Sequence, residues 1–398
     1  MPISDKTLNP THIQKGEAQD IHEMRDDNQD EGNGQQSIQS LHKAVHDRKE
    51  ESAAVNINIK MLSGWAIPPH ALAPLAHALR QYGQQFDRGE FRVDEWDAQT
   101  LMALATSWAH EAPKENTGEI PNRQTSATHL EIEHILECAA TTLGLSASGQ
   151  RHETTESETP KECWLVGWSL GGMLAVALAH RYPESVTGVI TLGANACFST
   201  QADWPNAMPR STFEQFYKRF QRSPERALKR FAFLCTSCNA HSTLSGAAPM
   251  SPSVEIDQEK LEPSTPPEAL TKPARCPQAL AQLLEADMQA SLDSISTRSS
   301  LRKGLDLLGE LDNREALVAL QCPQLHLFAE GDMLVPLSAT EDIEALIRLN
   351  NKAECAVVQG VHNFPMVAAE ASASVIHHFI QHHSIQHHNI HPQSHCAR

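Results

Sequence analysis

The residues with the clearest chemical potential in this sequence are a serine and the two glycines around it. Gly167-Trp168-Ser169-Leu170-Gly171 fits the pattern G-x-S-x-G, in which a nucleophilic serine stands on a sharp turn between a strand and a helix. Glycines at both ends let the strand and the helix approach without clashes, and the helix N-terminus favours developing negative charge. The apolar runs CWLV before the motif and GGMLAVALA after it provide the strand and the helix. We therefore favour a nucleophile over the alternative, a chance glycine-serine turn.

A serine hydroxyl becomes a useful nucleophile when a base takes its proton and a carboxylate orients that base. After a nucleophile of this type the chain order is serine, then carboxylate, then histidine. Asp332 follows the strand-like run LHLFAEG and His362 follows AVVQGV, so both should reach the edge of the sheet that carries Ser169. The alternatives for Asp332 are a plain Gly-Asp turn or a competing carboxylate, Glu330 or Asp342. The sequence therefore predicts a catalytic set of Ser169, Asp332 and His362.

Attack of a serine on a carbonyl creates an oxyanion, which preorganised N–H donors must stabilise. One donor is expected at the backbone of Leu170, directly after the nucleophile. The other is expected in the loop Ser63-Gly64-Trp65-Ala66, where Trp65 is placed to donate its backbone N–H and to line the pocket. The alternative for Trp65 is ordinary packing of a large side chain. This chemistry needs no metal or organic cofactor, and none is expected.

The elements that must position these residues alternate between strand and helix patterns. The early segments are strands at 55–62 and 91–96 and helices at 70–82, 101–111 and 129–145. Residues 163–193 show strand, tight turn, apolar helix, loop and strand, a βαβ unit that favours a parallel sheet. Strand-then-loop units follow at 323–332 and 353–362, and 373–383 is the last helix. The predicted fold class is α/β, with a mostly parallel central sheet flanked by helices.

Composition divides the chain into parts. Residues 1–51 are polar and almost free of aromatic residues, which predicts a disordered extension. The core is expected at 52–197 and 306–382. Residues 198–305 carry helical segments without strand alternation, which predicts a helical lid over the sheet with a flexible Ser/Pro-rich loop at 240–273.

The composition of the whole chain limits its partners. The 398 residues carry a net charge of −17, which argues against a general nucleic-acid binder. No apolar run reaches the ~18 residues of a membrane span, and the N-terminus lacks the apolar region of a secretory signal. The nine cysteines form an odd, scattered set, which favours thiols in a reducing cytoplasm. We expect a cytoplasmic monomer that binds neither nucleic acid nor membrane.

Two further patterns could support chemistry of another kind. Cys235-x-x-Cys238 could be redox-active, but no strand precedes it and no helix begins at its first cysteine, so we interpret Cys235 as part of the pocket wall. Eight histidines lie between His377 and His395 and could bind nickel or zinc. We nevertheless expect no metal site and interpret 383–398 as a disordered or fraying tail.

One long run, LVGWSLGGMLAVALAHRYPESVTGVITLGANACFSTQADWP, resembles the pimeloyl-acyl-carrier-protein methyl ester esterases of biotin synthesis, which belong to the α/β-hydrolase superfamily. Trp168, the pair Cys197-Phe198 and the run Asp203-Trp204-Pro205 are more specific than G-x-S-x-G alone. RFAFLCT (230–236) resembles that family's substrate-contacting helix, and CPQLHLFAEGDMLVP and VHNFP complete the match. The resemblance covers most of residues 55–382, in order.

The resemblance implies an α/β-hydrolase fold with a helical lid and a serine esterase with the triad Ser169, Asp332 and His362. It also implies the following substrate contacts: Trp65, Ser169, Leu170, Phe231, Ala232, Phe233, Leu234, Cys235 and His362. The implied substrate is the methyl ester of pimeloyl-acyl-carrier protein, which is hydrolysed through an acyl-enzyme. Two departures lie near the pocket. The family's usual His-Gly-Trp-Gly is Ser63-Gly64-Trp65-Ala66 here, and its DLPGxGxS is replaced by DEWDAQT.

A basic segment interrupts this acidic chain. Residues 210–230 contain two carboxylates, Glu214 and Glu225, against seven cations, Arg210, Lys218, Arg219, Arg222, Arg226, Lys229 and Arg230. Ser223-Pro224-Glu225 is typical of a helix start, and Arg226 and Arg230 then share one face of the new helix. Acyl carrier proteins are acidic, so this face could dock the carrier that bears the ester. The alternative is an ordinary solvated helix face.

Two other classes of function stay open at this point. The first is another α/β-hydrolase chemistry, such as a general short-chain carboxylesterase, a carbon–carbon bond hydrolase or an acyltransferase. The second is a non-catalytic binding module that kept the fold. The complete set of serine, aspartate and histidine argues against the second.

Overall fold

The structure is a computed structural model that describes residues 56–84, 91–98, 100–103, 127–146, 161–238, 277–290 and 295–389. The chain divides after Ser52 into two units, and every described residue belongs to the second. The extension predicted at 1–51 and the loop predicted at 240–273 lie outside the described residues.

A six-stranded sheet forms the centre of the described unit, in the order β2-β1-β3-β4-β5-β6, and each of its pairings is parallel. Its strands are β1 (Asn56–Leu62), β2 (Phe91–Trp96), β3 (Lys161–Trp168), β4 (Gly188–Leu192), β5 (Gln324–Ala329) and β6 (Ala353–Val358). The central strands β4 and β5 are buried at every residue, because helices cover both faces of the sheet. The predicted α/β class with a parallel sheet is confirmed.

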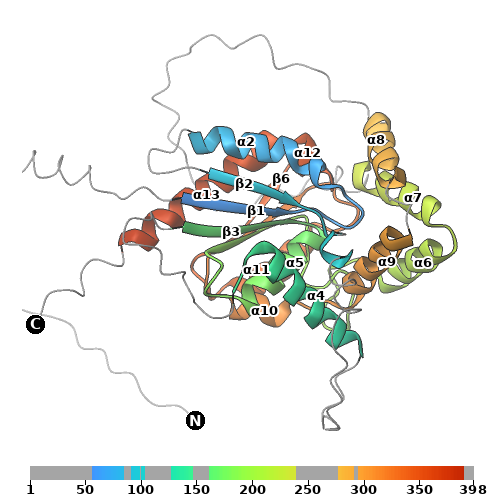
Figure 1. Cartoon of the computed structure of the whole chain (residues 1–398), viewed down its shortest axis with the longest axis horizontal. Helices are drawn as coiled ribbons and strands as arrows, with labels where there is room; N and C mark the ends of the chain where they lie inside the picture. The colour runs from blue at the N-terminus through green and yellow to red at the C-terminus, as the bar shows by residue number, and fades with distance from the viewer. Residues whose placement is uncertain are drawn as a thin grey trace, which may run out of the picture. The chain divides into compact units, whose positions relative to one another are not determined.

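Helices cover the two faces of the sheet (Figure 1). One face carries α2 (Ala73–Gln84), α12 (Phe364–Val367) and α13 (Ala369–Asn389), and a 3₁₀ turn, η1 (Pro69–Leu72), precedes α2. The other face carries α4 (Ala127–Leu143), α5 (Leu170–Arg181), α10 (Arg314–Ala319) and α11 (Ala339–Ile347). All residues from Leu170 to Ala179 in α5 are buried, which explains why this helix is apolar on every side.

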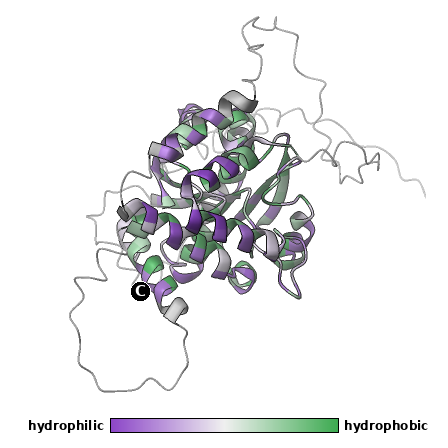
Figure 2. Cartoon of the chain, turned by 90° about the vertical axis from the view of Figure 1, so that its right-hand side faces the viewer, coloured by the Kyte–Doolittle hydropathy of each residue, from purple (hydrophilic) through white to green (hydrophobic). Residues whose placement is uncertain are grey.

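A group of helices between β4 and β5 lies at the carboxyl ends of the strands, on the right of Figure 1. This lid consists of α6 (Arg210–Arg222), α7 (Pro224–Thr236), α8 (Pro277–Ala290) and α9 (Ile295–Glu310). Figure 2 looks onto this side and shows hydrophilic and hydrophobic residues on the same helices, as expected for amphipathic elements. The predicted lid boundary at 305 cuts through α9, because this helix continues to Glu310.

The tail predicted from residue 383 begins too early, because α13 continues to Asn389. Two contacts involve the first residues of the predicted tail. The Ser384 hydroxyl donates a hydrogen bond to the buried Glu162 carboxylate at 2.6 Å, and the rings of Phe379 and His383 lie 4.5 Å apart. Among the described helices, none combines the length and the apolar character needed to cross a membrane.

Candidate active site

Ser169 occupies the sharp turn between β3 and α5. Its backbone has φ 54° and ψ −118°, one of two non-glycine residues with positive φ in the described ranges. Such a conformation costs of order 1–3 kcal/mol and is typical of functional turns. A Cβ at Gly167 would lie 2.2 Å from the carbonyl oxygen of Gly171, and one at Gly171 would lie 2.2 Å from that of Leu62. The two glycines of the motif are therefore steric requirements of this turn.

Asp332 and His362 form a buried hydrogen-bonded pair beyond the ends of β5 and β6. Asp332 Oδ2 and His362 Nδ1 are 2.7 Å apart, and neither side chain is more than 1% exposed. The other carboxylate oxygen, Oδ1, accepts the backbone N–H groups of Leu334 at 2.7 Å and Val335 at 3.0 Å. These bonds fix the carboxylate, so the imidazole is held from one side in a single orientation.

The structure pairs His362 with Asp332 and with neither competing carboxylate. Glu330 is exposed to solvent, and Asp342 belongs to the first turn of α11. The alternative of a plain Gly-Asp turn does not account for a carboxylate buried against an imidazole. Asp332 is therefore the acid that the fold brings to the histidine.

The second imidazole nitrogen of His362, Nε2, is buried and has no hydrogen-bond partner among the described residues. Ser169 is 5% exposed, and its hydroxyl is not bonded to His362 here. Hydrogen bonds of catalytic groups are often long without a ligand and shorten when substrate binds. The acid–base half of the predicted set is thus assembled, and its role in catalysis stays a prediction.

Trp168, which the sequence singled out only for the family resemblance, connects the elbow to the histidine. Gly193, which the sequence reasoning missed, lies beside the pair of Asp332 and His362. Trp168, next to Ser169, donates its indole N–H to the His362 carbonyl at 3.0 Å. Gly193 follows β4 with φ 55°, and a Cβ there would lie 3.3 Å from Asp332 Oδ2 and 3.4 Å from His362 Nδ1. The only sequence signal for Gly193 is its place after VITL, at the end of the strand beside the elbow.

The loop after β1 lies directly against the nucleophile elbow. A Cβ at Gly64 would lie 3.1 Å from the Cβ of Ser169, so glycine permits this approach. No acceptor for the Trp65 backbone N–H is found in the described part of the chain, and Leu170 starts α5, where N–H groups have no intrahelical partner. Both N–H groups are thus available to donate, and their role as oxyanion donors stays a prediction.

The Trp65 side chain is packed under the lid. It is 1% exposed, and its indole N–H donates to the Leu301 carbonyl in α9 at 2.7 Å. The rings of Phe216, Phe220 and Phe231 meet it edge-on at centroid distances of 5.5, 5.6 and 4.9 Å. The packing alternative therefore describes this side chain, and the sequence reasoning missed Phe216 and Phe220.

The residues of α7 predicted to contact substrate do not share one face. Phe231, Ala232 and Cys235 are buried, whereas Phe233 is 50% exposed, with the Arg230 guanidinium 5.2 Å from its ring centroid. Residues two positions apart on a helix point in nearly opposite directions, so Phe231 and Phe233 cannot both face the site. The structure does not place Phe233 with the other predicted contacts.

Cys235 is fully buried at the end of α7. Burial, with a smaller effect from the Asp332 carboxylate, raises the pKa of the Cys235 thiol well above its usual value. A thiol that stays protonated is a poor nucleophile, which argues against redox chemistry at Cys235-x-x-Cys238. Within the described ranges, no group of three or more His, Cys, Asp or Glu side chains is arranged to hold a metal ion.

The motif residues of the family resemblance support the base of the lid. The Trp204 indole donates to Asn195 at 3.1 Å, and Arg314 forms ion pairs with Asp203 at 2.7 Å and Asp312 at 2.6 Å. Cys197 and Asp312 form an isolated antiparallel bridge. These contacts attach the segment after β4 to the start of α10.

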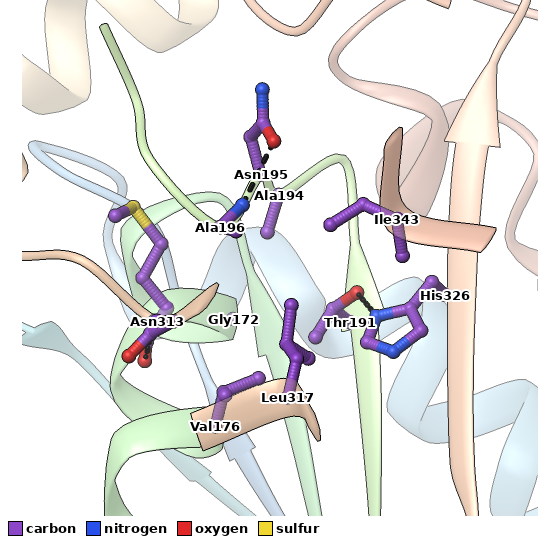
Figure 3. A pocket seen from close by; sticks show the side chains of 11 residues that line it. Gly172, Val176, Thr191, Ala194, Asn195, Ala196, Asn313, Leu317, His326 and Ile343 are labelled. Carbon is purple, nitrogen blue, oxygen red and sulfur yellow. Dashed lines mark hydrogen bonds between the residues drawn. The ribbon is translucent and has the colours of Figure 1, made fainter. Parts of the chain in front are cut away.

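A small cavity lies behind the elbow helix (Figure 3). Its lining includes Gly172, Thr191, Asn313 and His326, and none of the triad residues. Its volume of about 10 Å³ suits at most one water molecule. Because ligand pockets measure ~300–1,000 Å³, this cavity is no site for an acyl chain.

Comparison with known proteins agrees with this geometry. The family described as alpha/beta hydrolase fold matches residues 159–369, which is more than half of the chain. This chain therefore belongs to the α/β-hydrolase fold family. Solved structures share the fold: a bromoperoxidase from Bacillus anthracis has a TM-score of 0.51 at 13% identity, covering 83% of this chain and 93% of its own. An esterase from Exiguobacterium antarcticum has a TM-score of 0.50 at 13% identity, covering 82% and 93%.

Similar curated proteins include a biotin-synthesis protein and a pimeloyl-carrier methyl ester esterase. The biotin biosynthesis bifunctional protein BioHC of Cellvibrio japonicus is 36% identical over 205 residues, which is 52% of this chain and 32% of that protein. The pimeloyl-[acyl-carrier protein] methyl ester esterase of Xylella fastidiosa (strain M12) is 28% identical over 223 residues, or 56% of this chain and 72% of that one. The match thus spans about a third of the first relative's length. The predicted resemblance to this esterase family is confirmed.

Proposed function

We propose that this chain is a serine carboxylesterase that hydrolyses the methyl ester of pimeloyl-acyl-carrier protein. The observation that carries the proposal is the buried pair of Asp332 and His362, 2.7 Å apart, beside a serine in a strained strand-to-helix turn. Relatives named as esterases of this substrate support the choice of ester.

Each residue of the site has one role in the proposed reaction. Ser169 Oγ attacks the ester carbonyl while His362 Nε2 takes its proton, and Asp332 holds the imidazole and stabilises its positive charge. The backbone N–H groups of Leu170 and Trp65 stabilise the oxyanion. Methanol leaves with the proton from His362, and water then hydrolyses the acyl-enzyme by the same two steps.

The substrate must displace part of the lid to reach Ser169. Both Ser169 and His362 are buried, and the Trp65 ring is enclosed by Phe216, Phe220 and Phe231. These aromatic side chains are apolar, as a pocket for the methylene chain of a pimeloyl group requires. We infer that the acyl chain takes the place of some of these ring contacts when it binds.

The nucleophile is tested by a fluorophosphonate probe and by hydrolysis of p-nitrophenyl butyrate. We expect labelling and turnover by the wild-type protein, and loss of both in Ser169→Ala. Ser211→Ala changes an exposed serine in α6 and is the matched control. A Ser169→Ala variant that keeps full turnover would contradict the proposed nucleophile, and a folded wild-type protein that neither reacts nor turns over would favour the binding module.

The carrier is proposed to dock on α7. Arg226 and Arg230 are exposed one helical turn apart, and no carboxylate pairs with either among the described residues. Ser223 starts this helix, although its hydroxyl makes no capping bond. An acidic carrier brought to these guanidinium groups would lie on the helix whose buried face carries Phe231 and contacts Trp65.

Charge reversal tests this docking. The double variant Arg226→Glu with Arg230→Glu should raise KM for the carrier-bound ester and leave p-nitrophenyl butyrate hydrolysis unchanged. Arg92→Glu with Arg348→Glu alters net charge equally at two other exposed arginines and is the control. Equal losses on both substrates in the α7 variant would refute the docking surface.

The identity of the ester is tested in cells that require biotin because they lack the methyl esterase. We expect the wild-type chain to restore growth and Ser169→Ala to fail. Failure of a folded, probe-reactive wild-type protein would refute this substrate and favour a general short-chain carboxylesterase.

A further inference from the structure

Trp168 joins the two residues that must meet for proton transfer. It directly precedes Ser169 in the chain, and its indole N–H donates to the backbone carbonyl of His362 at 3.0 Å. The ring is fully buried, and its centroid lies 6.0 Å from that of the His362 imidazole at an angle of 42°. One side chain at the end of β3 therefore contacts both the backbone and the ring of the histidine.

Other contacts hold this histidine loop from different sides. The backbone N–H of Asn363 donates to the Cys235 carbonyl at the end of α7 at 3.1 Å. The N–H of Gly331 donates to the Gly360 carbonyl at 2.9 Å, which connects the aspartate loop to the histidine loop. Among the hydrogen bonds of the described residues, the one from Trp168 is the link between the histidine loop and the nucleophile elbow.

We propose that Trp168 is a positioning residue, whose indole N–H sets the distance between His362 and the Ser169 hydroxyl. This inference rests on the proposed serine mechanism. Asp332 fixes the imidazole at Nδ1, but neither this bond nor those of Asn363 and Gly331 attaches the histidine loop to β3. The Trp168 bond makes that attachment, because it joins the loop to the residue next to the nucleophile.

Loss of the indole N–H should weaken catalysis without weakening binding. The His362 carbonyl would lose its donor inside the protein, and a displacement of about 1 Å in a catalytic group can cost ~100-fold in rate. Because one of several restraints is removed, we expect a smaller effect, about 10-fold in the acylation rate. KM should stay the same, since the Trp168 indole is fully buried and its hydrogen bond and ring contact are both with His362.

The test compares two substitutions of the same kind in the same strand. Trp168→Phe removes the donor to His362. Trp164→Phe is the control, because Trp164 is equally buried in β3 and its indole donates to the Glu162 carboxylate at 2.9 Å, away from the triad. A second form of the protein carries 3-benzothienylalanine at position 168, which keeps the shape of the indole and replaces its N–H by sulfur.

The readouts are the single-turnover acylation rate with p-nitrophenyl butyrate, KM, and the downfield proton resonance of the Asp332–His362 hydrogen bond. We expect about 10-fold slower acylation, unchanged KM and a shifted resonance in both position-168 proteins. The Trp164→Phe protein should match the wild type in all three. A structural role alone would lower the unfolding midpoints of Trp168→Phe and Trp164→Phe alike and leave the resonance in place.

Acylation by the benzothienylalanine protein at the wild-type rate would overturn the proposal, even if Trp168→Phe folds poorly. Equal acylation rates in Trp168→Phe and Trp164→Phe would overturn it too. Turnover that persists in Ser169→Ala would instead refute the serine mechanism, so the two failures are distinguishable.

Discussion

The buried histidine His326 should make the folded protein lose stability in acid. It lies on β5 opposite Thr191 of β4, and its Nδ1 is 2.8 Å from the Thr191 hydroxyl (Figure 3). Burial lowers the pKa of His326 from 6.5 to about 4. Between these two pH values the unfolded chain binds a proton at this residue that the folded chain does not bind.

The size of the effect follows from that interval. One pKa unit corresponds to about 1.4 kcal/mol, so a shift from 6.5 to about 4 corresponds to about 3 kcal/mol of unfolding free energy. The direction of the effect on stability follows from the lowered pKa of His326 in the folded state. The contribution is complete above pH 6.5, decreases as the pH falls, and is lost near pH 4.

Urea unfolding followed by tryptophan fluorescence, at several pH values between 7 and 4, measures this loss. His326→Asn can keep a hydrogen bond to Thr191 but cannot titrate, so its stability should fall less steeply than that of the wild type, by about 3 kcal/mol over the range. Thr191→Val is the control, because it removes the hydrogen bond and keeps the imidazole, and its curve should stay as steep as the wild-type curve. Parallel curves for wild type and His326→Asn would refute the reasoning.

Three further predictions concern the surroundings of the site. Gly64→Ala places a Cβ 3.1 Å from that of Ser169, so we expect the rate of ester hydrolysis to fall by about 10–100-fold. The circular dichroism spectrum should stay unchanged, and unchanged kinetics would contradict this prediction. Ala66→Gly relieves a φ of 57°, so the free energy of unfolding should rise by about 0.5 kcal/mol after the entropy of glycine is counted. A lower free energy of unfolding in urea would count against strain there. Phe231→Ala should lower the free energy of unfolding by ~3–5 kcal/mol, whereas Phe233→Ala, at a half-exposed residue, should lower it little. Equal losses in urea unfolding would argue against the assigned faces of α7.

Sequence reasoning selected the candidate site residues whose signals are local. The elbow has a defined pattern, and Asp332 and His362 each follow an apolar strand, so the parallel sheet places all three at one edge. The order of these residues along the chain sufficed to select them. The spacing of Arg226 and Arg230 likewise predicted that they share an exposed face.

Contacts between distant segments could not be predicted in this way. The rings around Trp65 come from α6 and α7, and its indole partner comes from α9, so only the packing of the lid brings them together. To predict that Phe233 is exposed, one must know which face of α7 packs against the core. The motif RFAFLCT does not define that face. The contact of Ser384 in α13 with Glu162, which lies 222 positions earlier, likewise joins distant segments.

The position of the lid also bears on the order in which the sheet assembles. Thr191 and His326 face each other on neighbouring strands but are 135 positions apart in the chain. The entropic cost of closing a loop grows only with the logarithm of its length, about 0.6 kcal/mol per doubling. The long segment between β4 and β5 therefore costs the native state little at equilibrium. Folding rates are more sensitive, because contacts between distant residues form slowly. We therefore expect β3, α5 and β4 to form first as a local unit. The pairing of β4 with β5 should form late, because the whole lid segment between them must first fold back onto the sheet.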